Sequence, residues 1–133
     1  NQAIIKIRGA YAAWAKKHEM NYHELLVLYS IRDMEVATQK KVCDSYFLPK
    51  QTVNNIVVSM KNRGYVTLES VEGLGKEKAI VLTEEGRKYF DGIMEKLDAC
   101  EMDSVNEIGE DQLKSMIEIA DKYGEILWKL QGN

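Results

Sequence analysis

The spacing of apolar residues predicts a helix at the start of the chain. Between residues 2 and 18 such residues recur three or four positions apart, which places their side chains on one face of a helix. They are Ile4, Ile7, Tyr11 and Trp14. A second helix is predicted from Asn21 to about Asp33, because asparagine is a good N-cap and Glu24 stands at the capping-box position.

Two shorter helices are predicted next, joined by a tight turn. Thr38 is a suitable N-cap for the first of them, and Leu48–Pro49 ends it because proline is tolerated only in the first turn of a helix. The second runs from Pro49 to Arg63 and has a clean apolar stripe on one side. The stripe consists of Val53, Ile56, Val57 and Met60. Gly64 follows, where a helix C-cap favours glycine.

The pattern then changes to that of a β-hairpin. Residues 65–69 and 79–82 are two runs of strand-forming side chains, separated by a glycine-containing turn at 72–76. Two short helices followed by a hairpin are typical of a winged helix-turn-helix, in which the hairpin is the wing.

Helical spacing returns after the hairpin. Thr83 and the two glutamates that follow it predict the start of a fifth helix, with apolar positions at Tyr89, Phe90, Ile93 and Leu97. A sixth helix is predicted from about Glu110. Its stripe is Leu113, Ile117, Ala120, Gly124 and Leu127, with Trp128 beside it. The predicted fold class is therefore mainly α with a small β-hairpin wing.

The predicted domain organisation assigns separate roles to the centre and the ends of one compact domain. Residues 21–99 are the winged helix-turn-helix module, and residues 1–20 and 100–133 form a helical dimerisation region. The apolar residues near the two ends exceed what so small a module needs to cover itself, and a dimer interface would bury them. They are Ile4, Ile7, Leu127, Trp128 and Leu130. The alternative is that both terminal helices fold back on their own module.

Composition limits the class of protein. The 133 residues are 45% hydrophobic and 29% charged, as in a soluble domain with one core. No apolar run approaches the roughly 20 residues of a membrane helix, and no signal peptide is visible. Two cysteines, Cys43 and Cys100, are too few for a disulfide framework and fit a cytoplasmic protein. The two histidines lack metal-ligand spacing, so we expect neither metal nor cofactor.

The net charge of −3 is unevenly distributed. Residues 38–65 carry five basic residues against one acid, a local charge of +4, whereas residues 98–125 carry nine acids against two lysines, a local charge of −7. A local basic surface is what contact with nucleic-acid phosphates requires, whatever the global sum.

The polar face of the helix predicted at 49–63 is rich in amides and cations. Its members are Lys50, Gln51, Thr52, Asn54, Asn55, Ser59 and Lys61. Amides can pair with adenine edges in the major groove, and lysine can reach guanine or phosphate. No acid lies between Asp44 and Glu69, so nothing in this stretch repels DNA. An amphipathic helix packed on a core would also show polar residues to water, but the acid-free face favours DNA contact.

An ordered set of segments resembles the MarR family of transcriptional regulators. The segments are Thr38–Cys43, Leu48–Val53, Gly64–Val66 and Leu82–Gly86, and the resemblance covers about residues 21–90. It implies a homodimer in which each module enters the major groove at one half of a palindromic operator in double-stranded DNA. It also implies a regulator, most commonly a repressor, that a small aromatic effector releases.

The resemblance assigns roles to particular positions. Base contacts fall on Lys50, Gln51, Thr52, Asn54 and Asn55. Phosphate contacts fall on Thr38, Gln39 and Lys61, and wing contacts on Lys76 and Lys78. An effector pocket would be lined by Tyr11, Trp14, His23 and Tyr29; aromatic residues at this spacing are also typical of a plain core.

The sequence departs from the family pattern in the wing and in the turn. The segment Leu74–Lys78 has no arginine, and lysine lacks the planar fork with which arginine enters a minor groove. Pro49 replaces the usual serine at the start of the recognition helix, and Phe47 replaces a small residue in the turn. The missing arginine leaves a second hypothesis open, that of a winged-helix protein-interaction module without DNA binding.

Catalysis has little support in the sequence. There is no glycine-rich phosphate loop, no GxSxG motif and no metal-ligand spacing, so we do not expect an enzyme. Cys43 is expected to pack on the inward side of its helix rather than to act as a redox switch, and a reactive Cys100 has no support beyond its presence.

Overall fold

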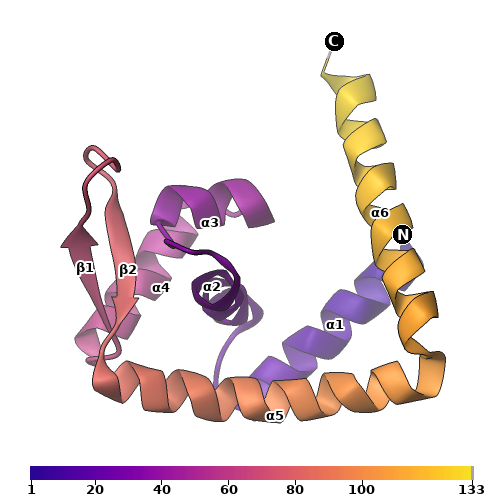
Figure 1. Ribbon diagram of the computed structural model, residues 1–133, viewed down its shortest axis with the longest axis horizontal. Helices are drawn as coiled ribbons and strands as arrows, with labels where there is room; N and C mark the ends of the chain where they lie inside the picture. Colours follow the sequence, from indigo (N-terminus) through magenta and orange to yellow (C-terminus); the bar gives the residue numbers. More distant parts are fainter. Residues whose placement is uncertain (133) are drawn as a thin grey trace. The chain divides into compact units, whose positions relative to one another are not determined.

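The computed structural model describes residues 1–132, and in this range it contains six helices and one two-stranded sheet (Figure 1). In chain order the elements are α1 (Gln2–Lys17), α2 (Tyr22–Asp33), α3 (Gln39–Tyr46), α4 (Lys50–Asn62), β1 (Val66–Ser70), β2 (Lys78–Leu82), α5 (Glu84–Ile108) and α6 (Glu110–Gln131). The prediction of a mainly α fold with a β-hairpin wing is confirmed, and the sequence patterns placed the start of each element within one or two residues of where it lies.

The chain forms two compact units, one of residues 1–93 and one from residue 94 onward. The core of the first unit lies around α2, on which Leu25, Val27 and Leu28 are buried. The predicted apolar stripe of α4, residues 53 to 60, is buried as well. Burying this stripe fixes the rotation of α4 about its own axis, so that its polar residues face away from the core.

Side-chain caps set the starts of α2 and α3. The Asn21 side chain accepts a hydrogen bond from the Glu24 backbone N–H at 2.8 Å, and the Thr38 hydroxyl accepts one from the Lys41 N–H at 3.1 Å, as the sequence predicts. The Glu24 carboxylate does not stay at the cap as a capping box requires. It forms an ion pair with Arg63, the C-cap residue of α4.

The turn between α3 and α4 has an unusual backbone. Phe47 is the C-cap of α3 and lies in the left-handed region, with φ 54° and ψ 42°, a conformation that usually selects glycine or asparagine. Pro49 is the N-cap of α4, with φ −60°, so the helix begins one residue later than the sequence pattern suggests. Together these two residues set the angle at which α4 leaves α3.

The hairpin is hydrogen-bonded to the segment that precedes α3. Its strands pair antiparallel, with Val66 opposite Leu82 and Leu68 opposite Ile80. The Ile80 N–H donates to the Ala37 carbonyl at 2.8 Å, which holds β2 against the residues that precede α3. Figure 1 shows the hairpin beside α3 and α4, so the wing and α4 belong to one module.

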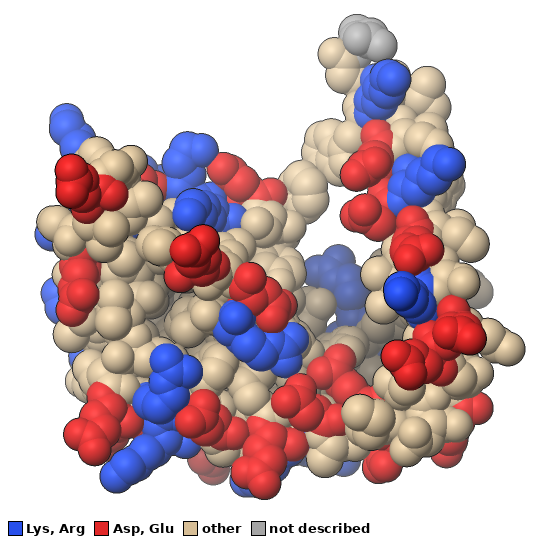
Figure 2. Space-filling model, viewed as in Figure 1, with Lys and Arg blue, Asp and Glu red and all other residues tan. Residues whose placement is uncertain are grey.

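The second unit contains the C-terminal part of α5 and the whole of α6. No residue of α6 is buried in the single chain. Its exposed apolar residues are Met116, Ile117, Ile119, Tyr123, Ile126, Leu127, Trp128 and Leu130. Acidic residues and lysines occupy many of the remaining positions of α6 (Figure 2). None of the helices in residues 1–132 combines the length and hydropathy that a membrane crossing requires.

Candidate nucleic-acid interface

The polar side of α4 carries the residues to which the family resemblance assigned base contact. Lys50, Gln51 and Asn55 are exposed, while Thr52 and Asn54 are half-buried. Lys61, assigned to phosphate contact, is exposed at the other end of the helix. None of these side chains is fully buried, because the opposite, apolar stripe of α4 packs into the core.

Two of the amides are already ordered relative to each other. The Gln51 side-chain amide donates to the Asn55 side-chain oxygen at 2.8 Å, one helical turn apart. Such a pair restricts the rotamers of both side chains before any partner binds. Because their rotamers are already restricted by this hydrogen bond, the two side chains would lose less conformational entropy on binding a base edge.

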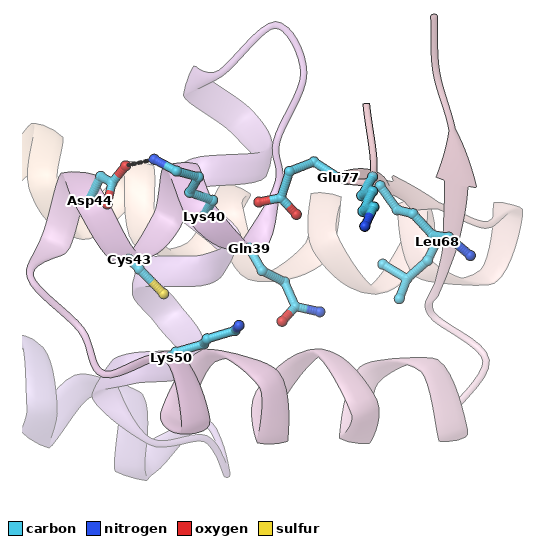
Figure 3. A pocket seen from close by; sticks show the side chains of 9 residues that line it. Gln39, Lys40, Cys43, Asp44, Lys50, Leu68 and Glu77 are labelled. Atoms are coloured by element: carbon cyan, nitrogen blue, oxygen red, sulfur yellow. Dashed lines mark hydrogen bonds and ion pairs between the residues drawn. The ribbon is translucent and has the colours of Figure 1, made fainter. Parts of the chain in front are cut away.

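A groove of about 550 Å³ separates α3 and the start of α4 from the hairpin. Its lining residues are Gln39, Lys40, Cys43, Asp44, Lys50, Leu68, Lys76, Glu77 and Lys78. Figure 3 shows Gln39 and Lys50 extending into the space between the two helices. Four lysines face two acids here, and one acid, Asp44, is paired with Lys40 at 2.9 Å. The groove therefore has a positive balance.

The surroundings of Thr38 do not fit the phosphate contact that was predicted for it. The side chain is 2% exposed, its hydroxyl caps α3, and its backbone pairs with Ala79 of β2. A buried side chain that already serves as a cap has no surface left for a phosphate. Its neighbour Gln39, half-buried in the groove, remains placed for such a contact.

Cys43 is less buried than the sequence predicts. It is half-buried and lines the groove rather than the core. Partial burial, followed by the nearby charge of Asp44, raises the pKa of the Cys43 thiol above its ordinary value, which lowers the fraction of reactive thiolate. Cys100, on α5, is exposed.

The four aromatic residues predicted to line an effector pocket lie on α1 and α2. Tyr11 and Tyr29 meet edge to face, with ring centroids 6.5 Å apart. Trp14 instead stacks on His18 at 4.0 Å. His23 lines a cavity next to the turn between α3 and α4.

The cavity beside His23 has a volume of about 470 Å³ and lies between α1, the start of α2 and the α3–α4 turn. The lining residues are Arg8, Tyr22, His23, Leu26, Ser45, Tyr46, Phe47, Leu48 and Pro49. The Arg8 guanidinium lies 5.8 Å from the centroid of the Tyr22 ring. Burial raises the pKa of the Tyr46 hydroxyl, so it stays protonated and able to donate. Aromatic walls, one cation and hydroxyl donors suit a small aromatic anion.

Sequence reasoning missed two features of these surfaces. Arg8 lies four residues after Ile4 and so falls beside the apolar stripe of α1, a placement that could have marked it as a pocket residue. Val58 lies on the outward, polar face of α4 and is exposed; helical spacing alone puts it one turn after Asn54. Across residues 1–132 no group of His, Cys, Asp and Glu is arranged to hold a metal ion.

Comparison with solved structures identifies the fold. A MarR family regulator from Neisseria meningitidis superposes with a TM-score of 0.85, covering 97% of this chain and 91% of its own at 22% identity. NadR in complex with 4-hydroxyphenylacetate superposes with a TM-score of 0.82, covering 95% and 92% at 13% identity. A Staphylococcus aureus MarR in complex with salicylate and kanamycin gives 0.74, covering 96% and 89% at 20% identity. No protein-family model and no curated protein matches the sequence. The chain has the winged-helix fold of MarR family transcriptional regulators.

Proposed function

We propose that this protein is a transcriptional regulator that binds double-stranded DNA as a homodimer, with α4 as the recognition helix. The observation that supports this most directly is the outward face of α4, which is exposed, free of acids and rich in amides. The lysine-lined groove beside it adds a surface of positive balance for the phosphate backbone.

Each assigned residue has a role in this proposal. Gln51, Asn54 and Asn55 contact base edges, and Lys50 and Thr52 contact bases or phosphates at the start of the helix. Lys61 and Gln39 contact phosphates on either side. Lys76 and Lys78 bring the wing to the backbone, where they supply charge without the base contacts that an arginine would make.

A salt titration of binding to random duplex tests the proposal. Affinity should fall steeply as salt rises, because each neutralised phosphate releases counterions. Replacing Lys50 by alanine should reduce the slope of log affinity against log salt by about 1 for each half-site. The matched control is Lys114→Ala on α6, which should leave the slope unchanged. Absence of duplex binding at low salt would reject DNA binding.

That negative result would favour the second candidate, a winged-helix protein-interaction module. One observation supports this alternative: the wing carries both signs of charge, with Glu72 and Glu77 interleaved with its lysines, and Figure 2 shows both signs at the hairpin tip. The acid-free face of α4 opposes it, because a solvated helix without a nucleic-acid partner usually mixes glutamate with lysine.

Homodimerisation is proposed from the apolar residues that α1 and α6 leave exposed. Ile4, Ile5 and Ile7 on α1 and the apolar face of α6 are exposed in the single chain, and apolar area of this extent favours association. A second copy of the chain is the proposed partner. In this arrangement the terminal helices are the dimerisation region, and the two copies of α4 meet successive major grooves of a palindromic site.

A small aromatic acid is the proposed effector, bound in the cavity beside His23. Two neighbours of similar fold were solved with salicylate or 4-hydroxyphenylacetate, and the cavity offers Arg8 as a counter-charge. Phe47 and Pro49 form its wall next to α4, so a bound ligand would contact the turn that orients the recognition helix. Such contact would let the effector change DNA affinity and release a repressor.

Calorimetric titration with salicylate and 4-hydroxyphenylacetate tests the cavity. Binding should weaken at least tenfold in Arg8→Gln, because the ligand carboxylate loses its ionic partner. Lys6→Gln, a nearby change of the same type on α1, should bind as the wild type does. Equal binding by wild type and Arg8→Gln would remove this cavity from the proposal, without affecting DNA binding.

A further inference from the structure

One apolar side chain stands on the polar outward face of α4. Val58 is 44% exposed, in a helix whose other aliphatic residues face the core. Helical spacing puts it on the same ridge as Gln51, two turns earlier, and next to Asn54 and Asn55, one turn earlier. These four residues are called the α4 ridge below.

The chemistry of the α4 ridge matches one kind of base pair. A carboxamide can pair with both N6 and N7 of adenine, and the only apolar group on a base edge in the major groove is the C5 methyl of thymine. Every adenine faces a thymine on the other strand. A ridge that joins three amides to one exposed valine is therefore complementary to A·T pairs on both strands. Arginine, which most often contacts guanine, is absent from the ridge.

Valine suits this role because its conformation is restricted. A β-branched residue in a helix occupies one χ1 rotamer about 90% of the time. The two methyl groups of Val58 are thus held in place before binding, and little rotamer entropy is lost when they contact a base. The hydrogen bond between Gln51 and Asn55 orders the neighbouring amides in the same way.

We propose that Val58 determines specificity by contacting a thymine methyl group, and that the bases facing the α4 ridge are A·T pairs. The inference rests on the proposed function and names the class of DNA site that the recognition helix prefers. It assigns the two lysines at the ends of α4 to the backbone or to flanking bases, and the centre of the helix to A·T recognition.

Deoxyuridine scanning tests this contact, since uracil differs from thymine only in lacking the methyl group. Sites are first selected from random duplex with the full chain, and each thymine of a selected half-site is then replaced in turn. At one position in each half-site, affinity should fall about fourfold, the effect of removing one buried methyl group. The selected half-sites should carry A·T pairs at and beside that position.

Two alanine variants identify the residue that senses the methyl group. Val58→Ala should bind the thymine and uracil duplexes equally at that position. Val71→Ala, the same change at a valine that is 39% exposed beyond β1, should keep the wild-type ratio. The comparison is a ratio within one variant, so a small change in overall stability does not alter it.

Three results would overturn the inference while DNA binding stands. They are affinity that is insensitive to every methyl group, an undiminished uracil penalty in Val58→Ala, and selected half-sites in which G·C pairs face the ridge. A wild-type chain that binds no duplex at low salt would overturn the proposed function and this inference together. The uracil scan on the wild type alone tests the thymine contact even where a variant folds poorly.

Discussion

The side chain of Arg63 connects the end of α4 with α2, with α5 and with the residue that precedes β1. It is the C-cap of α4, and its guanidinium forms an ion pair with Glu24 at the start of α2. The same group lies 5.1 Å from the ring centroid of Tyr65 and 5.9 Å from that of Tyr89, and these two rings stack at 4.4 Å. Partial burial lowers the pKa of Arg63, but the hydrogen bond and charge of Glu24 outweigh this and the net pKa is raised.

Removing this cation should destabilise the fold because the Glu24 side chain is only 10% exposed. We expect Arg63→Met to lower the free energy of unfolding by about 1–3 kcal/mol, since it leaves a nearly buried carboxylate without its partner. The double variant Glu24→Gln/Arg63→Met should recover part of the loss. Urea unfolding followed by circular dichroism measures both.

The control is the exposed ion pair of Lys40 with Asp44, where Lys40→Met should leave the free energy of unfolding nearly unchanged. A double variant less stable than Arg63→Met would contradict the assignment, because it would mean that the unpaired carboxylate was not the source of the loss.

Residue roles that depend on distant partners were not readable from the sequence. Glu24 stands correctly for a capping box, but its carboxylate pairs with a residue 39 positions away, which no local pattern encodes. Thr38 was identified correctly as a cap, yet burial by β2 excludes its predicted phosphate contact. Hydrogen bonds between residues a few positions apart can be predicted from their spacing in the sequence. Burial cannot, because it depends on which helices and strands pack against each other.

At the scale of elements, the joint at the base of the wing sets how the hairpin stands against α4 and α5. The Thr83 hydroxyl donates to the Gly64 carbonyl at 2.6 Å and accepts from the Gly86 N–H at 2.9 Å. Gly64 has a φ of 79°, which an L-residue with a side chain rarely adopts. A Cβ at Gly86 would lie 1.8 Å from the Tyr65 carbonyl oxygen. Glycine at 86 is therefore required by close approach of backbone.

Alanine at two positions of α5 should have opposite effects. Gly86→Ala should lower the free energy of unfolding by about 1–3 kcal/mol or more, because the methyl group meets backbone that cannot rotate away. Gly92→Ala, in the same helix with nothing within 4 Å, should raise it by about 0.5–1 kcal/mol through helix propensity. Thermal and urea unfolding of the two variants measure the contrast.

Equal stability of the two alanine variants would show that the joint at Gly86 is looser than its geometry indicates. Gly86→Ala could also lose DNA binding at a temperature where the variant remains folded. That result would show that the joint also orients the wing for contact with DNA.

The elements themselves were predictable because their signals are local. Apolar spacing located the buried stripe of α4, and caps located the starts of α2 and α3. The left-handed Phe47 was not predictable, since nothing in the sequence distinguishes an aromatic residue forced into that conformation from one inside a helix. The cavity beside His23 was missed for a related reason: its walls come from three segments that only the fold brings together.

At the scale of the whole molecule, the local excess of basic charge and the exposed apolar face of α6 occupy different parts of the chain. The basic stretch at 38–65 contains α3 and α4, and the acidic stretch at 98–125 contains the C-terminal part of α5 and most of α6. The acid-rich helices would repel phosphate, while the apolar face of α6 favours contact with protein. The distribution fits a division between a surface for DNA and a surface for a second copy of the chain.

Two lysine substitutions on α6, one on its apolar face and one on the opposite side, distinguish loss of a dimer contact from a general effect of added charge. Leu127 belongs to the exposed apolar face, and Glu125, two residues earlier, lies on the opposite side of the helix. In the proposed homodimer, Leu127→Lys should convert dimer to monomer in sedimentation velocity, because a charge would have to be buried in an apolar interface. Glu125→Lys should remain dimeric.

DNA affinity should follow the oligomeric state rather than the charge. Both variants gain positive charge, which by itself strengthens attraction to phosphate. Leu127→Lys should nevertheless bind a two-half-site operator at least about a hundredfold more weakly, since the second module no longer acts at high effective concentration, whereas Glu125→Lys should bind as tightly as the wild type or tighter. A dimeric, tightly binding Leu127→Lys would place the interface elsewhere, because no well-packed apolar contact tolerates an unpaired ammonium group.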